Sequence, residues 1–118
     1  MIHYEIYFDK YDWCVEVFIL LEKQNPNNIL KAVKNAGGSE KVLNASYASL
    51  MEDYNSGFTY SNSELRKSIM VINRSSSMLE FINTYNHEKN HVEMHICEEL
   101  NIDPYSEEAA YLSGDMAQ

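Results

Sequence analysis

The chain has few basic residues: nine lysines and arginines stand against eighteen aspartates and glutamates, and the formal net charge is −9. A nucleic-acid binder needs a basic surface to displace counterions from phosphates, and docking on anionic lipid needs one too. We therefore expect neither nucleic acid nor a membrane as a partner. The longest apolar stretch, from Val17 to Leu21, is also far too short to span a bilayer.

Cysteine is scarce as well. Cys14 and Cys97 lie far apart, so they form no CxxC pair and no disulfide framework. This scarcity favours a reducing, cytoplasmic location. The amino-terminal residues lack a basic segment followed by an apolar run, so they do not resemble a signal peptide. The length of 118 residues suits a single domain, 1–118.

Apolar residues alternate with polar ones in the first part of the chain. Period two predicts a strand over Ile2 to Phe8 and a second strand over Trp13 to Leu21, joined by a turn at Asp9 to Asp12. Two later segments, Phe58 to Tyr60 and Ser68 to Ile72, also predict strands. The sequence therefore indicates an antiparallel sheet of about four strands.

Three helices are predicted around this sheet before the last segment. The first begins at the cap Asn25 with Pro26 and ends at Gly37-Gly38, and the second runs from about Ser39 to Tyr54. The third is long, from about Met78 to Leu100, with its cap among three serines at 75–77. Together with the strands, these helices predict a small α+β domain.

The long helix has faces of different chemistry when it is wound at about 100° per residue. An apolar stripe, expected to face the core, comprises Met78, Ile82, Tyr85, Val92, Ile96 and Leu100. Lys89 falls on this stripe, where it either reaches solvent at the rim or interrupts the stripe. A separate polar face comprises Thr84, His87, Glu88, His91 and His95.

The segment His87-Glu88-x-x-His91 is the part of this face that carries chemistry. Histidines four residues apart lie about 6 Å apart along a helix and point the same way, so both can bind one zinc ion. Glu88 is rotated about 100° from His87 and can take a proton from a water that zinc activates. This HExxH pattern predicts a zinc hydrolase with Glu88 as general base. The alternative is that these histidines only pack or meet solvent.

The third protein ligand is sought first on the same helix. His95 lies about 12 Å along the axis from His87, too far for one tetrahedral zinc ion. The interval from Val92 to Met94 contains no glycine that would end the helix earlier. We therefore expect His95 either to support a ligand or to have no role in the site.

A helix after the reversal at Asn101 to Tyr105 is the next source of a ligand. About five extended residues cover roughly 15 Å, enough to return the chain to the level of His91. The following helix, capped by Ser106, opens with Glu107 and Glu108, and only one of them can point at the metal. The alternative is that both glutamates stabilise the amino terminus of their own helix.

Two segments together resemble the gluzincin branch of the zincin-like metallopeptidases: His87-Glu88-Lys89-Asn90-His91 and Glu107-Glu108-Ala109-Ala110-Tyr111. In that branch the third ligand is a glutamate on the helix after HExxH, within Glu-x-x-Ala-Asn or Glu-x-x-Ala-Asp. The match at Glu107 and Ala110 selects Glu107 over Glu108, whereas Tyr111 departs from the pattern. The chain's ending is also similar to small uncharacterised proteins of phages and bacterial mobile elements.

The resemblance covers residues 69–114 and implies a zincin-like metallopeptidase that hydrolyses peptide bonds in a peptide or protein substrate. His87, His91 and Glu107 would hold Zn²⁺ and Glu88 would act as general base. The supporting or substrate-contacting candidates are Tyr111, Tyr85, His95 and Glu108. The alternative function is a non-catalytic zincin-like domain that binds metal or a protein partner in a phage or mobile element.

The resemblance also implies that a sheet edge upstream of the metal helix binds extended substrate. The segment Ile69 to Asn73 is either that edge or an interior strand.

Overall fold

The computed structural model describes residues 1–22, 26–52 and 54–117, the last three of them as backbone only. These residues form β1 (Ile2–Phe8), β2 (Trp13–Ile19), α1 (Asn27–Asn35), α2 (Glu40–Leu50), β3 (Gly57–Asn62), β4 (Lys67–Ile72), α3 (Met78–Leu100) and α4 (Glu107–Ala117). The predicted α+β class is confirmed. The predicted cap Asn25 lies outside the described residues. None of the described helices combines the length and apolar character that crossing a bilayer requires.

The sheet has four strands in the order β1-β2-β4-β3 within the described residues. The prediction that it is antiparallel is wrong in one place. β1–β2 and β3–β4 are antiparallel, but the two central strands, β2 and β4, run parallel. The connection from β2 to β4 runs through α1, α2 and β3, and a connection of this length allows parallel pairing, whereas a short turn does not. The segment Ile69 to Asn73 therefore belongs to an interior strand and its end, and β3 is the sheet edge on that side.

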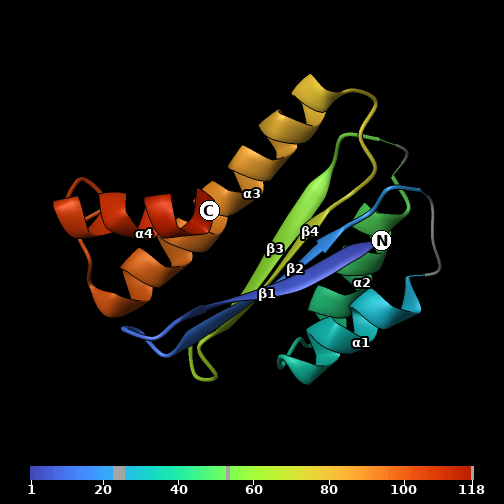
Figure 1. Ribbon diagram of the computed structural model, residues 1–118. Helices are drawn as coiled ribbons and strands as arrows, with labels where there is room; N and C mark the ends of the chain where they lie inside the picture. The colour runs from blue at the N-terminus through green and yellow to red at the C-terminus, as the bar shows by residue number, and fades with distance from the viewer. Residues whose placement is uncertain (23–25, 53, 118) are drawn as a thin grey trace.

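Helices cover both faces of the sheet, α1 and α2 on one and α3 and α4 on the other (Figure 1). Alternate residues of the central strands supply the two cores. Trp13, Val15 and Val17 face α3 and α4, whereas Phe18 and Val71 face α1 and α2. Strands covered on both faces carry nearly continuous apolar runs, as β2 and β4 do here.

Helix α3 has the bounds that the sequence predicts. The Ser77 hydroxyl accepts from the Glu80 amide at 3.1 Å, and Asn101 ends the helix in the left-handed region at φ 56°. The apolar stripe is buried only along its second half, at residues such as Val92 and Ile96. Met78 and Ile82, predicted to be on the core side, are exposed because α4 returns only part of the way along α3.

Candidate metal site on helix α3

His87 and His91 are exposed neighbours on one face of α3. Their Nε2 atoms lie 3.1 Å apart, and their rings meet edge to face with centroids 4.7 Å apart. Two nitrogens bound at 2.0–2.1 Å to one tetrahedral zinc ion lie about 3.3 Å from each other. The spacing of the two Nε2 atoms is therefore close to that of two ligands on one zinc ion, and in this structure it corresponds to a hydrogen bond between the rings.

Glu88 is held between these histidines and strand β3. Its side chain is 5% exposed, and its Oε1 accepts a hydrogen bond of 2.9 Å from the Thr59 hydroxyl. Its other carboxylate oxygen accepts none from the part of the chain that the structure describes. The strand passes close by, because a Cβ on Gly57 would lie 3.0 Å from Glu88 Cγ. An oriented, buried carboxylate with one open oxygen is suited to proton transfer.

An open depression of about 360 Å³ joins these groups. It lies between the helix and the amino-terminal end of β3, and the residues that form it include Asn55, Ser56, Gly57, Thr84, His87 and Glu88. Hence at least one of the paired histidines and the general-base candidate share one solvent-accessible space.

His95 continues the histidine face but has partners of its own. Its Nδ1 lies 2.7 Å from the Ser61 hydroxyl, which lies 2.7 Å from the Ser68 hydroxyl. The indole of Trp13 donates to Ser68 at 3.0 Å, so the chain of hydrogen bonds reaches the core. Burial first, and then the neighbouring His91, lower the pKa of His95. The ring centroid lies 6.3 Å from that of His91, a position that suits a fixed neighbour of the site.

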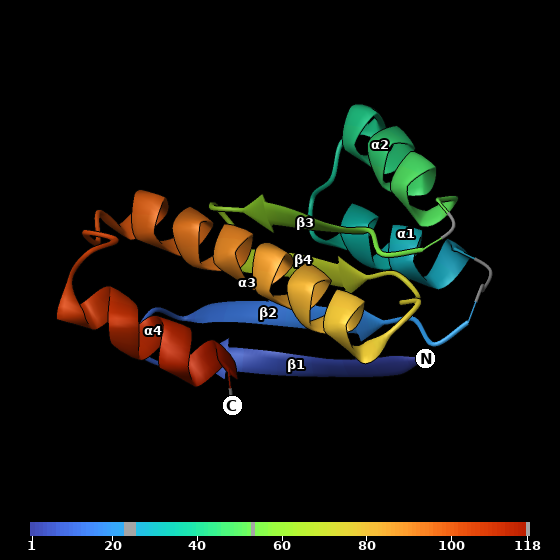
Figure 2. The same cartoon turned by 90° about the horizontal axis from the view of Figure 1, so that it is seen from above.

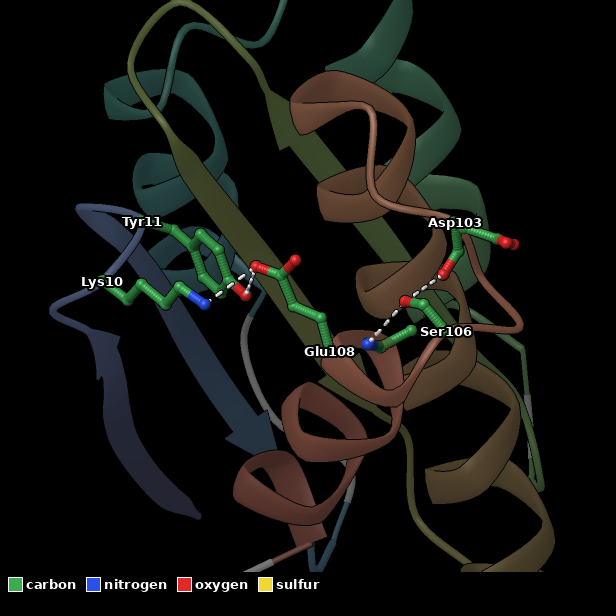
Figure 3. A network of polar contacts seen from close by, with 6 residues as sticks. Lys10, Tyr11, Asp103, Ser106 and Glu108 are labelled. Carbon is green, nitrogen blue, oxygen red and sulfur yellow. Dashed lines mark hydrogen bonds and ion pairs between the residues drawn. The ribbon is translucent and has the colours of Figure 1, made fainter.

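The two glutamates of α4 lie elsewhere. Figure 3 shows Lys10 and Tyr11, from the β1–β2 turn, directed at Glu108. The Tyr11 hydroxyl donates to Glu108 at 2.7 Å and the Lys10 ammonium lies 3.0 Å away. The hydrogen bond from Tyr11 and then that from Lys10 hold the pKa of Glu108 below its usual value. Glu107 and Glu108 line a second, larger depression of about 670 Å³ beside β1.

Glu107 and Glu108 lie there because α4 packs on the flank of α3 that is opposite β3. Figure 2 shows α4 on the β1 side of α3 and β3 on the other side. The contact uses Lys89, whose ammonium lies 2.7 Å from Glu93 and 2.9 Å from the Ser113 hydroxyl. Lys89 therefore interrupts the apolar stripe with a polar contact between helices.

The structure consequently does not bring Glu107 to His87 and His91. In the described residues no three His, Cys, Asp or Glu side chains lie close enough together to hold one metal ion. The two predicted histidine ligands thus lie together on α3, and the third predicted ligand lines a different depression.

The two tyrosine candidates also lie away from the histidines. Tyr85 packs against the core, where burial and then a hydrogen bond with Tyr4 of β1 raise its pKa. Tyr111 is exposed and lines the depression that holds Glu107. Neither tyrosine lines the depression formed by His87 and Glu88.

The sequence analysis missed the contribution of β3 to the site. Gly57, Thr59 and Ser61 turn one face of this strand toward α3, while Phe58 and Tyr60 pack against the core below. The signal was present as an alternation of small or hydroxyl residues with aromatic ones. The prediction recognised only Phe58 to Tyr60 as a strand and so did not assign this face.

Comparison with known proteins adds no relative: no family model, no curated protein and no solved structure matches the chain. The gluzincin resemblance therefore stays a prediction from the residues that carry it.

Proposed function

We propose that the chain is a zinc-dependent hydrolase of peptide bonds, with His87 and His91 as protein ligands and Glu88 as general base. The observation that carries the proposal is the pair of exposed Nε2 atoms 3.1 Å apart on one helix face. This separation is close to that of two ligands on one tetrahedral ion. Glu88 follows His87 in the chain and lines the same depression.

In this proposal the residues of the site have separate roles in the reaction. Bound zinc would lower the pKa of a water molecule and polarise the carbonyl of the scissile bond. Glu88 takes a proton from the attacking water and returns it to the leaving amine. The hydroxyl of Thr59 orients the carboxylate for both transfers. His95, fixed by Ser61, limits the space beside His91.

The position of β3 supports a peptide as the substrate. β3 is the last strand of the sheet on this side, and its first residue, Gly57, lines the depression with His87 and Glu88. An extended peptide can add to such an edge through main-chain hydrogen bonds. The edge then brings a peptide bond to the side of α3 that carries the histidines.

The position of Glu107 favours a second function. Catalytic zinc sites usually have three protein ligands, and the described residues bring only two together. A domain that binds metal on two histidines without catalysis, or that uses this face for a protein partner, would need no third ligand.

A measurement of zinc affinity distinguishes a site formed by the two histidines from one that also uses Glu107. The affinity is measured for the wild type, His91→Ala, Glu107→Ala and, as a surface control, Glu64→Ala. We expect about one zinc per chain and a loss of more than about 100-fold in His91→Ala, beyond that typical of a supporting residue. An equal loss in Glu107→Ala would mean that α4 moves to the histidines when zinc binds. A wild type that binds no zinc after its addition would contradict both functions that involve metal.

A measurement of peptide hydrolysis distinguishes the proposed enzyme from a non-catalytic binding domain. A mixture of unstructured peptides is incubated with the zinc-loaded wild type and with Glu88→Gln. We expect cleavage by the wild type, and loss of cleavage with retained zinc in the variant. A wild type that holds zinc and cleaves none of the peptides would favour the non-catalytic domain.

A further inference from the structure

Strand β1 leaves a long apolar edge open. It ends the sheet opposite β3, and five of its seven residues are exposed. On the side that faces α3 and α4, Ile2 is 47% and Tyr4 36% exposed. An edge of this kind, without proline or a bulge, is suited to pairing with another strand.

The charges on the other side of β1 are not balanced within the chain. Glu5 lies directly opposite Glu16 of β2. Glu16 already has His3 at 2.8 Å and Lys67 at 3.5 Å. Glu5 has no cationic partner among the residues that the structure describes. Like charges facing each other in a ladder are unfavourable, so Glu5 is available to a polar partner from a second molecule.

Self-pairing of β1 offers Glu5 such a partner in one register. In an antiparallel pair, residues directly opposite each other lie on the same face of the sheet. A twofold axis perpendicular to the sheet therefore lies midway between one residue and the same residue of the second copy. An axis at His3 sets His3 against itself, and an axis at Glu5 sets two carboxylates together. An axis at Tyr4 sets each His3 against Glu5 of the second copy.

We propose that β1 pairs antiparallel with β1 of a second copy of this chain, about a twofold axis at Tyr4. The pairing joins the two sheets edge to edge and forms two His3–Glu5 contacts. His3 contacts Glu16 of its own chain through Nε2, and in this register it lies opposite Glu5 of the second copy. The two Tyr4 side chains meet at the axis.

The larger depression supports the same arrangement. In this register Ile2 of the second copy lies opposite Ile6, which lines the depression of about 670 Å³ together with Tyr111. Tyr111 is 69% exposed. The first residues of each copy therefore cover the near end of the other copy's depression, and an apolar contact is added to the main-chain hydrogen bonds.

The first test measures the dimer directly. Sedimentation equilibrium of the wild type should show twice the mass of one chain. Glu5→Lys sets lysine against His3 of the second copy but against Glu16 of its own chain. We expect its dimer dissociation constant to rise about tenfold or more, without a fall in monomer stability. The control Glu64→Lys makes the same charge change in the β3–β4 turn and should leave the dimer unchanged. A wild type of single-chain mass at every concentration would overturn the proposal.

The second test determines the register in which the two β1 strands pair. Tyr4→Cys, in a Cys14→Ser background, sets two thiols opposite each other at a distance that a disulfide spans. Tyr7→Cys in the same background sets them about 20 Å apart, six residues along the strand. Mild oxidation should link the first variant and not the second. Equal linking of both would overturn the register. If Tyr4→Cys fails to fold, the Glu5→Lys result still decides the proposal.

Discussion

The two flanks of α3 carry similar residues with different partners. On the α4 flank, the carboxylates of Glu93 and Glu108 each have a lysine within 3.0 Å. On the β3 flank, Glu88 is more deeply buried, and its partner is the neutral hydroxyl of Thr59. No cation pairs with Glu88 in the part of the chain that the structure describes.

The difference supports a structural role for the paired carboxylates and the proposed role of Glu88. A buried carboxylate without a cation costs stability. The paired carboxylates stabilise the docking of α4 and of the β1–β2 turn. The unpaired one lies beside two converging histidines. Charge pairing within the fold therefore separates Glu88 from Glu108 better than their place in a motif does.

The largest effect should come from disturbing the β3 flank at Gly57. A Cβ there would lie 2.6 Å from the Val71 carbonyl oxygen and 3.0 Å from Glu88 Cγ. We expect Gly57→Ala to lower the free energy of unfolding by about 1–3 kcal/mol through overpacking, as measured by urea denaturation. The matched control is Gly114→Ala on α4, which has nothing within 4 Å of the added carbon. It should stabilise the helix by about 0.5–1 kcal/mol, and a loss as large as that of Gly57→Ala would contradict the comparison.

A smaller effect is expected on the α4 flank at Lys89. Lys89→Met removes the partner of Glu93 and the contact with Ser113, and both charged side chains are largely buried. We expect a loss of about 1–2 kcal/mol in unfolding free energy, with zinc affinity unchanged. Lys31→Met, at an exposed position on α1, should stay within about 0.5 kcal/mol. Weakened zinc binding in Lys89→Met would show that the two flanks are not independent.

The smallest effect concerns Glu108 and depends on pH. The folded-state pKa of Glu108 lies below the ordinary value of 4.5, because of Tyr11 and then Lys10. A depressed carboxyl pKa stabilises the fold above pH 4.5, and this contribution is lost as the pH falls through the folded-state value. The wild type should therefore be slightly more stable than Glu108→Gln at pH 7 and should lose this advantage in acid. In a Tyr11→Phe background, which lacks the hydrogen bond to Glu108, the difference should shrink; if it does not, the pairing at Glu108 is not the cause.

Local signals predicted the elements that depend on neighbouring residues. The alternation predicted β1 with its observed bounds and β2 with its observed start, although β2 ends at Ile19 and not at Leu21. Ser77 and Asn101 begin and end α3 as expected. Ser106 likewise caps α4, where its hydroxyl accepts from the Ala109 amide at 3.2 Å. Each of these features leaves a pattern in nearby residues, namely alternating side chains in the strands and capping residues at the helix ends.

Long-range choices could not be predicted in the same way. The reach argument placed the start of α4 at the level of His91, whereas Ser106 lies near Cys97 and Ser113 is the residue that meets Lys89. The argument also gave no flank, and the flank decides whether Glu107 meets the histidines. Lys89 on the apolar stripe was the one sequence signal for a polar contact there. The parallel direction of β4 also escaped prediction, because strand patterns carry no direction.

The parallel pairing of β2 with β4 bears on the order of folding. The β1–β2 and β3–β4 hairpins join residues near in sequence, but Cys14 of β2 pairs with Lys67 of β4. Pairing across such a separation is slow, because a long loop must close first. During synthesis on a ribosome, the inner edge of β2 stays unpaired until α1, α2, β3 and β4 have been made. A chaperone that shields this edge would therefore be most useful to the nascent chain before Ile72 emerges.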